Sequence, residues 1–223
     1  KMGIKYFFSD ISDGNLAFHV GDKKENVEKN REKLAIKYGY DNHKLVYMNQ
    51  VHGNNIVIVD ENSPKLIEDC DAIITKARNL PLMVMVADCI PVLLFDEKVG
   101  LISAIHAGRN STFLEIVKKT AQIFIEKFSS NPEDIKAILG PSIQKCCYEV
   151  SAEMAKIVEN SFGKSFVDNR NIDLQNINKM QLNSLGIKDV YISDVCTKCS
   201  NKPYFSYRDD NKCGRFAAVI ELK

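Results

Sequence analysis

Three side chains that can bind metals or act as nucleophiles stand beside short hydrophobic runs in this sequence. Cys89 separates the runs at 82–87 and 91–95, His106 ends the run at 101–105, and His52 precedes a glycine between two expected strands. One Cys and two His are three ligands, which leaves a fourth position on Zn²⁺ for water or substrate. The set therefore has the stoichiometry of a catalytic metal site.

The residue types alone leave other interpretations open. Cys89 could be a nucleophile activated by His106 as a base, without any metal. The three residues could also be unconnected core and turn residues, because they are far apart in the sequence and do not have the compact spacing of a zinc finger. The sequence alone does not establish that the three residues converge.

The elements around these residues indicate how they would be positioned. Short apolar runs bounded by turn residues are typical of buried strands, so we expect Cys89 and His106 at neighbouring strand ends. Thr112 and Glu115 have the spacing of a capping box, which predicts that a helix starts at Thr112 and ends near residues 131–132. Its N-terminal amides would favour an anion, such as phosphate, near Thr112.

Arginines near these elements are further candidates for anion binding. Arg109 directly follows the His106 turn, and Arg208 and Arg215 lie near the C-terminus. A guanidinium group can bind phosphate or carboxylate through two parallel hydrogen bonds. Asp88 could orient a metal ligand or simply end a strand.

A second group of cysteines lies later in the chain. Cys196 and Cys199 have the CxxC spacing, which suits both zinc and redox chemistry. With Cys146 and Cys147 they would make a four-thiolate site. Adjacent cysteines rarely both reach one tetrahedral metal, so we expect simple loop packing for these four thiols.

The remaining pattern interleaves strands and helices without strict alternation. Strands are expected at 4–8, 16–20, 45–48, 56–59, 72–75, 135–139 and 190–192, with a hairpin-like pair in 203–222. Helices are expected at 23–38, 151–162 and 173–185. This order favours an α+β (layered α/β) fold with mixed sheets in a single domain over 1–223.

Composition restricts the class of partner. The 223 residues carry 30 basic and 29 acidic side chains, a formal charge of +1, which gives no reason to expect nucleic acid or a membrane surface as partner. No apolar run is long enough to span a membrane, and the N-terminus lacks a signal-peptide pattern. The seven cysteines are odd in number. We therefore expect a cytoplasmic protein with reduced thiols and a small-molecule partner.

Several motifs, in order, resemble one known family. NQVHG, DCDAIIT, ADCIPVLLFD, IHAG, LGPSIQKCCYEV, CTKC and FSYR are similar to the motifs of the YfiH-like family, also named multicopper polyphenol oxidoreductase or laccase-domain proteins. The resemblance covers residues from about 18 to 220. One departure is that IHAG is followed here by RNST, whereas the family has WRGT, so that Arg109 is displaced by one position.

The resemblance implies a four-layer α/β/β/α sandwich and a metal site formed by His52, Cys89 and His106. It further implies a zinc-dependent purine nucleoside phosphorylase, acting on adenosine, inosine, guanosine or methylthioadenosine with phosphate, that also deaminates adenosine. We expect a monomer or homodimer. The alternatives are a copper-dependent polyphenol oxidoreductase, which would need more than the 4 histidines present, a metal-free hydrolase using Cys89 and His106, and a non-catalytic binding or regulatory protein.

Overall fold

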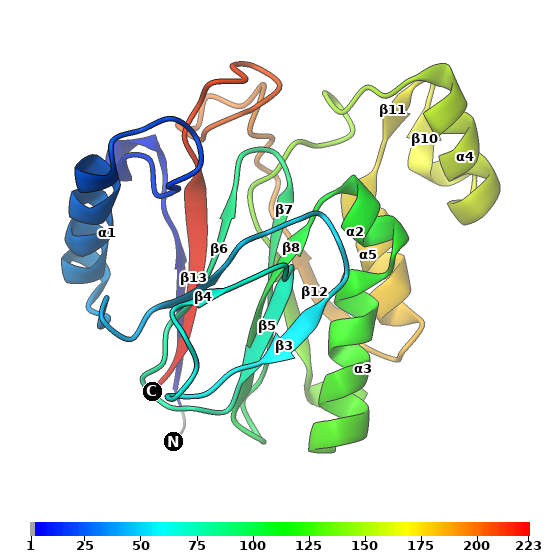
Figure 1. The fold of residues 1–223 in the computed structure, drawn as a ribbon. Coiled ribbons are helices and arrows are strands. Elements are labelled where there is room, and N and C mark those ends of the chain that lie inside the picture. Colours follow the sequence, from blue (N-terminus) through cyan, green and yellow to red (C-terminus); the bar gives the residue numbers. More distant parts are fainter. Residues whose placement is uncertain (1–2) are drawn as a thin grey trace.

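Two β-sheets pack face to face in the computed structural model, which describes residues 3–223 (Figure 1). The first sheet has five strands in the order β1 (Ile4–Phe8), β13 (Phe216–Leu222), β6 (Leu82–Val86), β2 (Val46–Met48) and β4 (Leu66–Ile67). The second sheet has six strands in the order β12 (Asp189–Ile192), β9 (Lys136–Leu139), β7 (Ile90–Asp96), β8 (Leu101–Ala107), β5 (Ala72–Thr75) and β3 (Ile56–Ile58).

Both sheets are mixed, as the sequence predicted. In the first sheet β13 runs antiparallel to β1 and β6, whereas β2 runs parallel to β4 and β6. In the second sheet β7 and β8 form an antiparallel centre, and parallel pairs lie at both edges. A small separate hairpin joins β10 (Val167–Asp168) to β11 (Asn171–Ile172).

The central strands are apolar throughout because both of their faces are buried. In β7, Leu93 and Phe95 belong to the hydrophobic cluster between the two sheets, and Val92 and Leu94 to the cluster beneath the helices. Successive side chains of a strand point to opposite faces, so a strand in the middle of a layered fold needs apolar residues at every position. This explains the continuous hydrophobic runs of the sequence.

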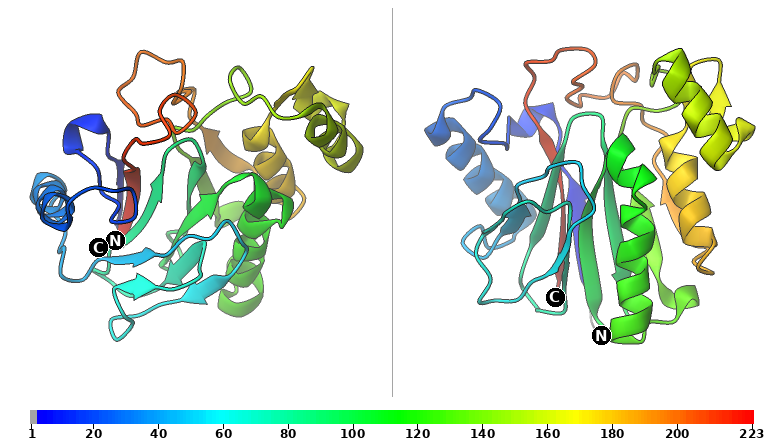
Figure 2. Two further views of the ribbon diagram at one scale, coloured as in Figure 1. Left: turned by 45° about the horizontal axis from the view of Figure 1, so that its top comes forward. Right: turned by 45° about the vertical axis from the view of Figure 1, so that its right-hand side comes forward.

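Helices cover the outer faces of the two sheets. Helix α1 (Lys24–Tyr38) packs on the first sheet, where Leu34 and Ala35 share a cluster with residues of β6 and β13. The second sheet is covered from the other side by α2 (Arg109–Phe113), α3 (Ile116–Phe128), α4 (Ala152–Phe162) and α5 (Leu174–Asn183). Both views of Figure 2 keep α1 on one side and α2 to α5 on the other. The four-layer α/β/β/α arrangement is thus confirmed.

Short 3₁₀ helices at Ile11–Asp13, Pro132–Asp134 and Lys164–Phe166 complete the secondary structure. Among the helices of the described residues, none is both long and apolar enough to cross a membrane.

The helix expected to start at Thr112 is different in the structure. It starts at Arg109 and is interrupted at Glu115, whose left-handed backbone (φ 61°) separates α2 from α3. Thr112 lies inside α2, so the predicted capping box does not form. Gly108 is the N-cap instead, and the fully buried Thr112 hydroxyl accepts a hydrogen bond from Asn178 of α5 at 3.0 Å.

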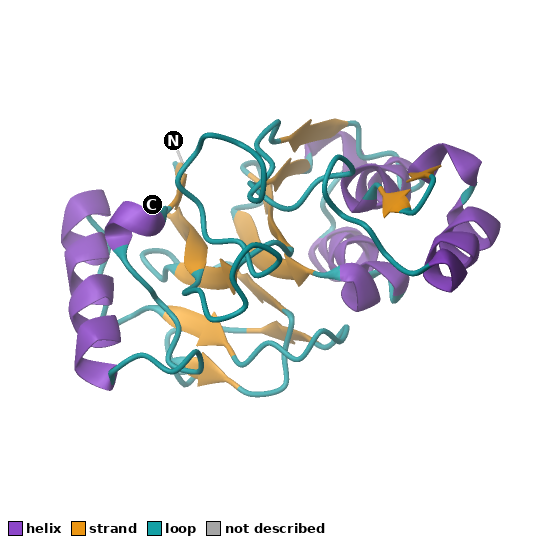
Figure 3. Cartoon of the chain, turned by 90° about the horizontal axis from the view of Figure 1, so that it is seen from above, coloured by secondary structure: helices purple, strands orange, loops and turns teal. Residues whose placement is uncertain are grey.

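Two other expectations were wrong. The segment 16–20 is not a strand, because Leu16 and Ala17 are buried in the cluster beneath α1 instead of pairing along a sheet. Residues 203–215 do not form a hairpin with the last strand, because β13 takes β1 and β6 as its two neighbours. The segments before β13 and after β12 instead form loops at one end of the sheets, which Figure 3 views from above.

Candidate metal centre and active site

His52, Cys89 and His106 converge at the end of the sheets that carries these loops. One ligand atom of each lies within 4.8 Å of the others. The Cys89 Sγ is 3.8 Å from Nε2 of His52, and the two imidazole rings stand edge to face with centroids 4.7 Å apart. Convergence of the three residues, which the sequence could not establish, is a feature of the fold.

The pairing of β7 with β8 brings Cys89 to His106. Ile90 faces Ala107 and Pro91 faces His106 in this antiparallel pair, so the residue before β7 lies beside the end of β8. The turn holding Cys89 is tight, and Asp88 adopts a left-handed backbone (φ 94°) within it. The two strand ends predicted from sequence are therefore neighbours.

The loop after β2 brings His52 to the same place. The Gln50 side chain donates to the Met85 carbonyl at 2.7 Å and accepts from the Met85 amide at 3.0 Å, which extends the pairing of β2 with β6. The amides of Val51, His52 and Gly53 then donate to the carboxylate of Asp71 at 2.9–3.2 Å. These bonds hold the left-handed backbone of His52 (φ 57°) in place.

Asp71 also orients His106. Its Oδ1 lies 2.7 Å from Nδ1 of His106, and both side chains are buried. A carboxylate in this position fixes the ring and leaves the other nitrogen, Nε2, to act as a ligand. Asp71 was not among the site residues predicted from the sequence. The available signal was its place directly before the strand 72–75, in a motif rich in acidic and thiol groups.

Asp88, considered as the orienting acid, has another role. Its carboxylate accepts hydrogen bonds from the Thr197 hydroxyl at 2.6 Å and from the Arg208 amide at 2.7 Å. It therefore holds the C-terminal loops beside the site, whereas Asp71 contacts the ligands.

Charges in the site favour a thiolate beside an imidazolium when no metal is bound. Burial by itself would raise the pKa of Cys89, but the charge and hydrogen bond of His106, together with His52, lower it to about 6. Burial would lower the pKa of His106, but the Cys89 thiolate and Asp71 raise it to about 9. Burial also opposes ionisation of Asp71, yet its hydrogen bond to His106 leaves the pKa of this carboxyl below its usual value.

The three residues fit a metal ion. One thiolate and two imidazole nitrogens are a donor set suited to Zn²⁺ or copper, and the bond from Asp71 to His106 is the support that metal-bound histidines usually have. Gly108 leaves the space that the donors need. A Cβ at this position would be 3.0 Å from Cδ2 of His52 and 3.1 Å from the Cys89 Sγ.

A pocket of about 750 Å³ opens onto the three residues. Three of the four predicted anion-binding residues line it, namely Arg109, Arg208 and Arg215. Arg208 also donates to the Glu149 carbonyl at 2.8 Å and lies 5.1 Å from the ring centre of Tyr148, another lining residue. The pocket thus combines the candidate metal centre with several cationic side chains.

Thr112 is not part of this pocket. It is fully buried, and both its hydroxyl and its carbonyl accept hydrogen bonds from α5, through Asn178 and Gln181. The expectation that Thr112 binds phosphate is therefore wrong, because the side chain packs between helices.

Arg31 lines the pocket but was not predicted from the sequence. It lies on the buried face of α1, its Nε donates to the Leu16 carbonyl at 2.9 Å, and its guanidinium lies near the rings of Phe18 and Tyr47. The sequence did contain a sign of this role. Arg31 lies on the same helix face as Val27, where an apolar residue is usual.

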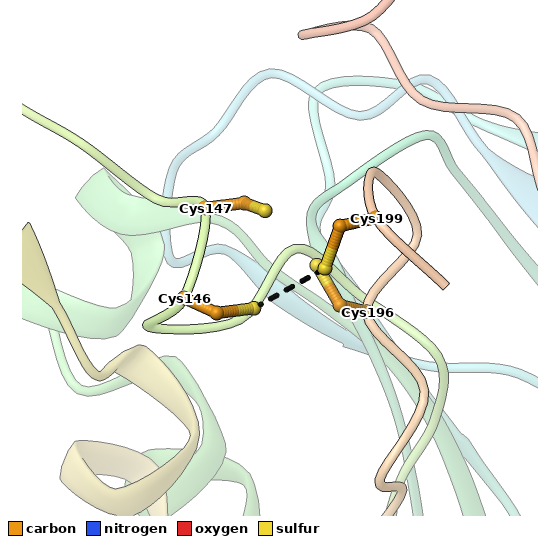
Figure 4. Close-up of side chains that lie close together, drawn as sticks. All are labelled: Cys146, Cys147, Cys196 and Cys199. Atoms are coloured by element: carbon orange, nitrogen blue, oxygen red, sulfur yellow. Dashed lines mark hydrogen bonds between the residues drawn. The ribbon is translucent and has the colours of Figure 1, made fainter. Parts of the chain in front are cut away.

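The four other cysteines of interest also come together, contrary to the expectation of loop packing. Four sulfur atoms lie within 4.8 Å of one another, those of Cys146, Cys147, Cys196 and Cys199 (Figure 4). The cause is the parallel pairing of β9 with β12, which sends the loops that follow them to the same end of the sheet. Sequence separation had concealed this contact.

Comparison with known proteins places these features in a family. A family model described as multi-copper polyphenol oxidoreductase laccase matches residues 7–223. A solved structure of the hypothetical protein YfiH of Bacillus licheniformis superimposes with a TM-score of 0.91 at 27% identity, covering 99% of this chain and 93% of that one. YlmD of Geobacillus stearothermophilus gives 0.87 at 26% identity, covering 100% of this chain and 91% of that chain.

Curated relatives of higher identity carry the name of an activity. A purine nucleoside phosphorylase of Corynebacterium glutamicum is 36% identical over 214 residues, which is 93% of this chain and 86% of the relative. A purine nucleoside phosphorylase of Campylobacter jejuni is 33% identical over 225 residues, covering 98% and 97%. The similarity extends over nearly the full length of both chains.

Proposed function

This chain belongs to the multi-copper polyphenol oxidoreductase laccase family, and we propose that it is a zinc-dependent purine nucleoside phosphorylase. The substrates would be adenosine, inosine, guanosine or methylthioadenosine together with phosphate, and the products a free base and the corresponding ribose 1-phosphate. The observation that carries the proposal is the pocket in which His52, Cys89 and His106 lie among several arginines. The names of the curated relatives support it.

In the proposed phosphorolysis, a phosphate oxygen bonds to C1′ of the ribose while the bond from C1′ to the purine nitrogen breaks. The base leaves with the electron pair of that bond and takes up a proton. Arg109, Arg208 and Arg215 would bind the phosphate, because guanidinium groups neutralise its charge and fix its orientation. Tyr148 offers an aromatic wall against which a purine can stack.

We propose that His52, Cys89 and His106 bind Zn²⁺, with Asp71 holding His106 in the orientation that presents Nε2. When bound, Zn²⁺ supplies a Lewis acid at the pocket, the chemistry that hydrolytic deamination of adenosine requires. Adenosine deaminase activity is therefore the second reaction that we assign to this site.

One observation favours a different reaction type. Without metal, Cys89, His106 and Asp71 have the order of a nucleophile, a base and an orienting acid, as in cysteine hydrolases. A copper-dependent oxidation of phenols is the other alternative. Against it, the described residues supply three donors at the site, His52, Cys89 and His106, and the chain has 4 histidines in total, fewer than a multicopper oxidase needs.

The test is to measure metal content and to assay inosine with and without phosphate. Phosphate-dependent release of hypoxanthine and ribose 1-phosphate is expected, and it should be lost in His52→Ala and Cys89→Ala. The matched control is His43→Ala, an exposed histidine that does not line the site pocket. Full activity after exhaustive chelation would instead favour the hydrolase, and bound copper with phenol oxidation and no nucleoside cleavage would contradict the proposal.

The arginines can be tested in the same assay. Loss of a charged hydrogen bond to phosphate costs about 1.5–3 kcal/mol, so Arg109→Met should raise KM for phosphate by about 10- to 150-fold. Arg78→Met, at an exposed arginine outside the pocket lining, is the control. An unchanged KM for phosphate in Arg109→Met would remove Arg109 from the proposed anion site.

A further inference from the structure

A cluster of four thiols lies outside the pocket lining and has no part in the proposed reaction. Cys146 and Cys147 belong to the loop after β9, and Cys196 and Cys199 to the loop after β12. Their side chains point toward a common space in Figure 4, where the dashed line joins Cys146 and Cys199. The sulfurs of these two residues are 3.5 Å apart.

The distances between the sulfurs match a four-coordinate metal better than a disulfide. With Zn–S bonds of about 2.3 Å, the sulfurs at two corners of a tetrahedron are about 3.8 Å apart. The four sulfurs here all lie within 4.8 Å of one another, so small side-chain rotations would complete the tetrahedron. A disulfide has a bond of about 2.05 Å and joins only two sulfurs, which would leave two thiols of the cluster unexplained.

Backbone contacts bring the two loops together independently of the thiols. Ser142 and Cys196 form an isolated parallel bridge, and the Thr197 amide donates to the Ser142 carbonyl at 3.1 Å. The Gln144 side chain adds a bond to the Ser193 carbonyl at 2.5 Å. The two loops are thus held together by the fold. Binding a metal would therefore require little further loss of conformational entropy to bring the four ligands together.

The four sulfurs share one small space. They all lie within 4.8 Å of one another, and Cys196 is buried whereas Cys146 and Cys199 are exposed. Several thiolates cannot share so small a space without a cation, whereas a divalent metal neutralises them.

We propose that Cys146, Cys147, Cys196 and Cys199 form a structural four-thiolate zinc site, separate from the centre at Cys89. Four protein ligands close the coordination sphere of Zn²⁺ and leave no position for substrate, so the role of this metal is to join the two loops. The inference does not depend on the proposed nucleoside chemistry.

The site lies where it can fix one wall of the pocket. Tyr148, which directly follows Cys147, lines the pocket. Thr197, between the two cysteines of the other loop, donates to the carboxylate of Asp88, next to Cys89. A metal that joins these loops would hold Tyr148 and Asp88 in fixed positions, as the support of a binding site requires.

Metal analysis of variants tests the proposal. Protein purified under reducing conditions in the Cys89→Ser background, which removes the thiolate of the other centre, should retain one equivalent of zinc. The added pair Cys146→Ser and Cys199→Ser should abolish it, whereas Cys213→Ser, at a cysteine outside both clusters, should not. Zinc content that is the same with and without the pair of serines would overturn the proposal. Cobalt substitution in the same background should give the sulfur-to-metal charge-transfer bands of a tetrahedral thiolate site.

A second experiment uses the unaltered protein and does not depend on the folding of any variant. Cys146 and Cys199 are exposed, so a maleimide can reach their sulfurs when no metal is bound. We expect these two cysteines to be protected in the zinc-loaded protein and to become reactive after chelation at a pH high enough to form thiolates, as measured by peptide mass spectrometry. Equal reactivity of Cys146 and Cys199 before and after chelation, or a disulfide in protein kept under reductant, would contradict the proposal.

Discussion

Oδ1 of Asp71 lies 2.7 Å from Nδ1 of His106, and the same carboxylate accepts hydrogen bonds from the backbone amides that hold His52. One buried acid therefore positions both histidines of the candidate metal centre. The register of β5 with β8 produces this arrangement, because Ala72 faces Ile105 and so places Asp71 beside His106.

The first prediction concerns this acid. Asp71→Asn keeps the size of the side chain but removes its charge and one acceptor oxygen, so it should lower zinc affinity by about 10- to 100-fold. A competition titration with a chromophoric chelator measures the affinity. Asp69→Asn is the matched control, because Asp69 is exposed and its left-handed backbone (φ 46°) suits asparagine. Equal affinities for the two variants would show that Asp71 does not support the metal.

Gly108 provides the second prediction. Its backbone (φ −75°, ψ −178°) is open to alanine, so Gly108→Ala should fold, but the added methyl group would press on His52 and Cys89 at 3.0–3.1 Å. If this crowding reduces the free energy of metal binding by about 1–3 kcal/mol, the metal affinity falls by about 5- to 150-fold.

The control for this variant is Gly53→Ala. At that position a Cβ has ordinary contacts of 3.6–3.7 Å, and we expect near-normal metal affinity. Calorimetric titration of both metal-free proteins makes the comparison, and unchanged binding by Gly108→Ala would mean that the ligands do not need this space.

The third prediction is a pH dependence in the metal-free protein. Because His106 and His52 lower the pKa of Cys89 to about 6 despite burial, its thiolate should form as the pH rises through 6. Alkylation of Cys89 by iodoacetamide should therefore increase between about pH 5 and pH 7 and then level off, whereas an ordinary thiol with a pKa of about 8.5 would continue to gain reactivity up to pH 9 or higher.

Cys213 is the internal comparison for this experiment, because burial raises the pKa of its thiol. Peptide mass spectrometry follows both residues in one sample, and added zinc should block the reaction at Cys89. A midpoint for Cys89 near pH 8.5 would rule out the thiolate–imidazolium pair.

The fourth prediction separates packing from anion binding at Thr112. Thr112→Val removes the hydroxyl that accepts from Asn178 in a fully buried position. The free energy of unfolding should fall by about 1–3 kcal/mol, with KM for phosphate unchanged. Thr112→Ser retains the hydroxyl and should lose less stability. A large increase in KM without loss of stability would restore Thr112 to the anion site.

The sequence by itself determined most elements of the fold and the three candidate ligands. Apolar runs such as 91–95 identify buried strands because their composition follows from burial on both faces. The residue types of His52, Cys89 and His106, at the ends of such runs, made these residues candidates for metal binding or nucleophilic catalysis. Each of these inferences depends only on the properties of a short stretch of chain.

Only the tertiary structure decided which groups meet. Strand register selected Asp71 over Asp88 as the partner of His106, and helix packing turned Thr112 away from the pocket. The pairing of β9 with β12 assembled the four cysteines from two distant loops. Contacts of this kind depend on which surfaces pack together across long sequence separations, and no local pattern of residues encodes them.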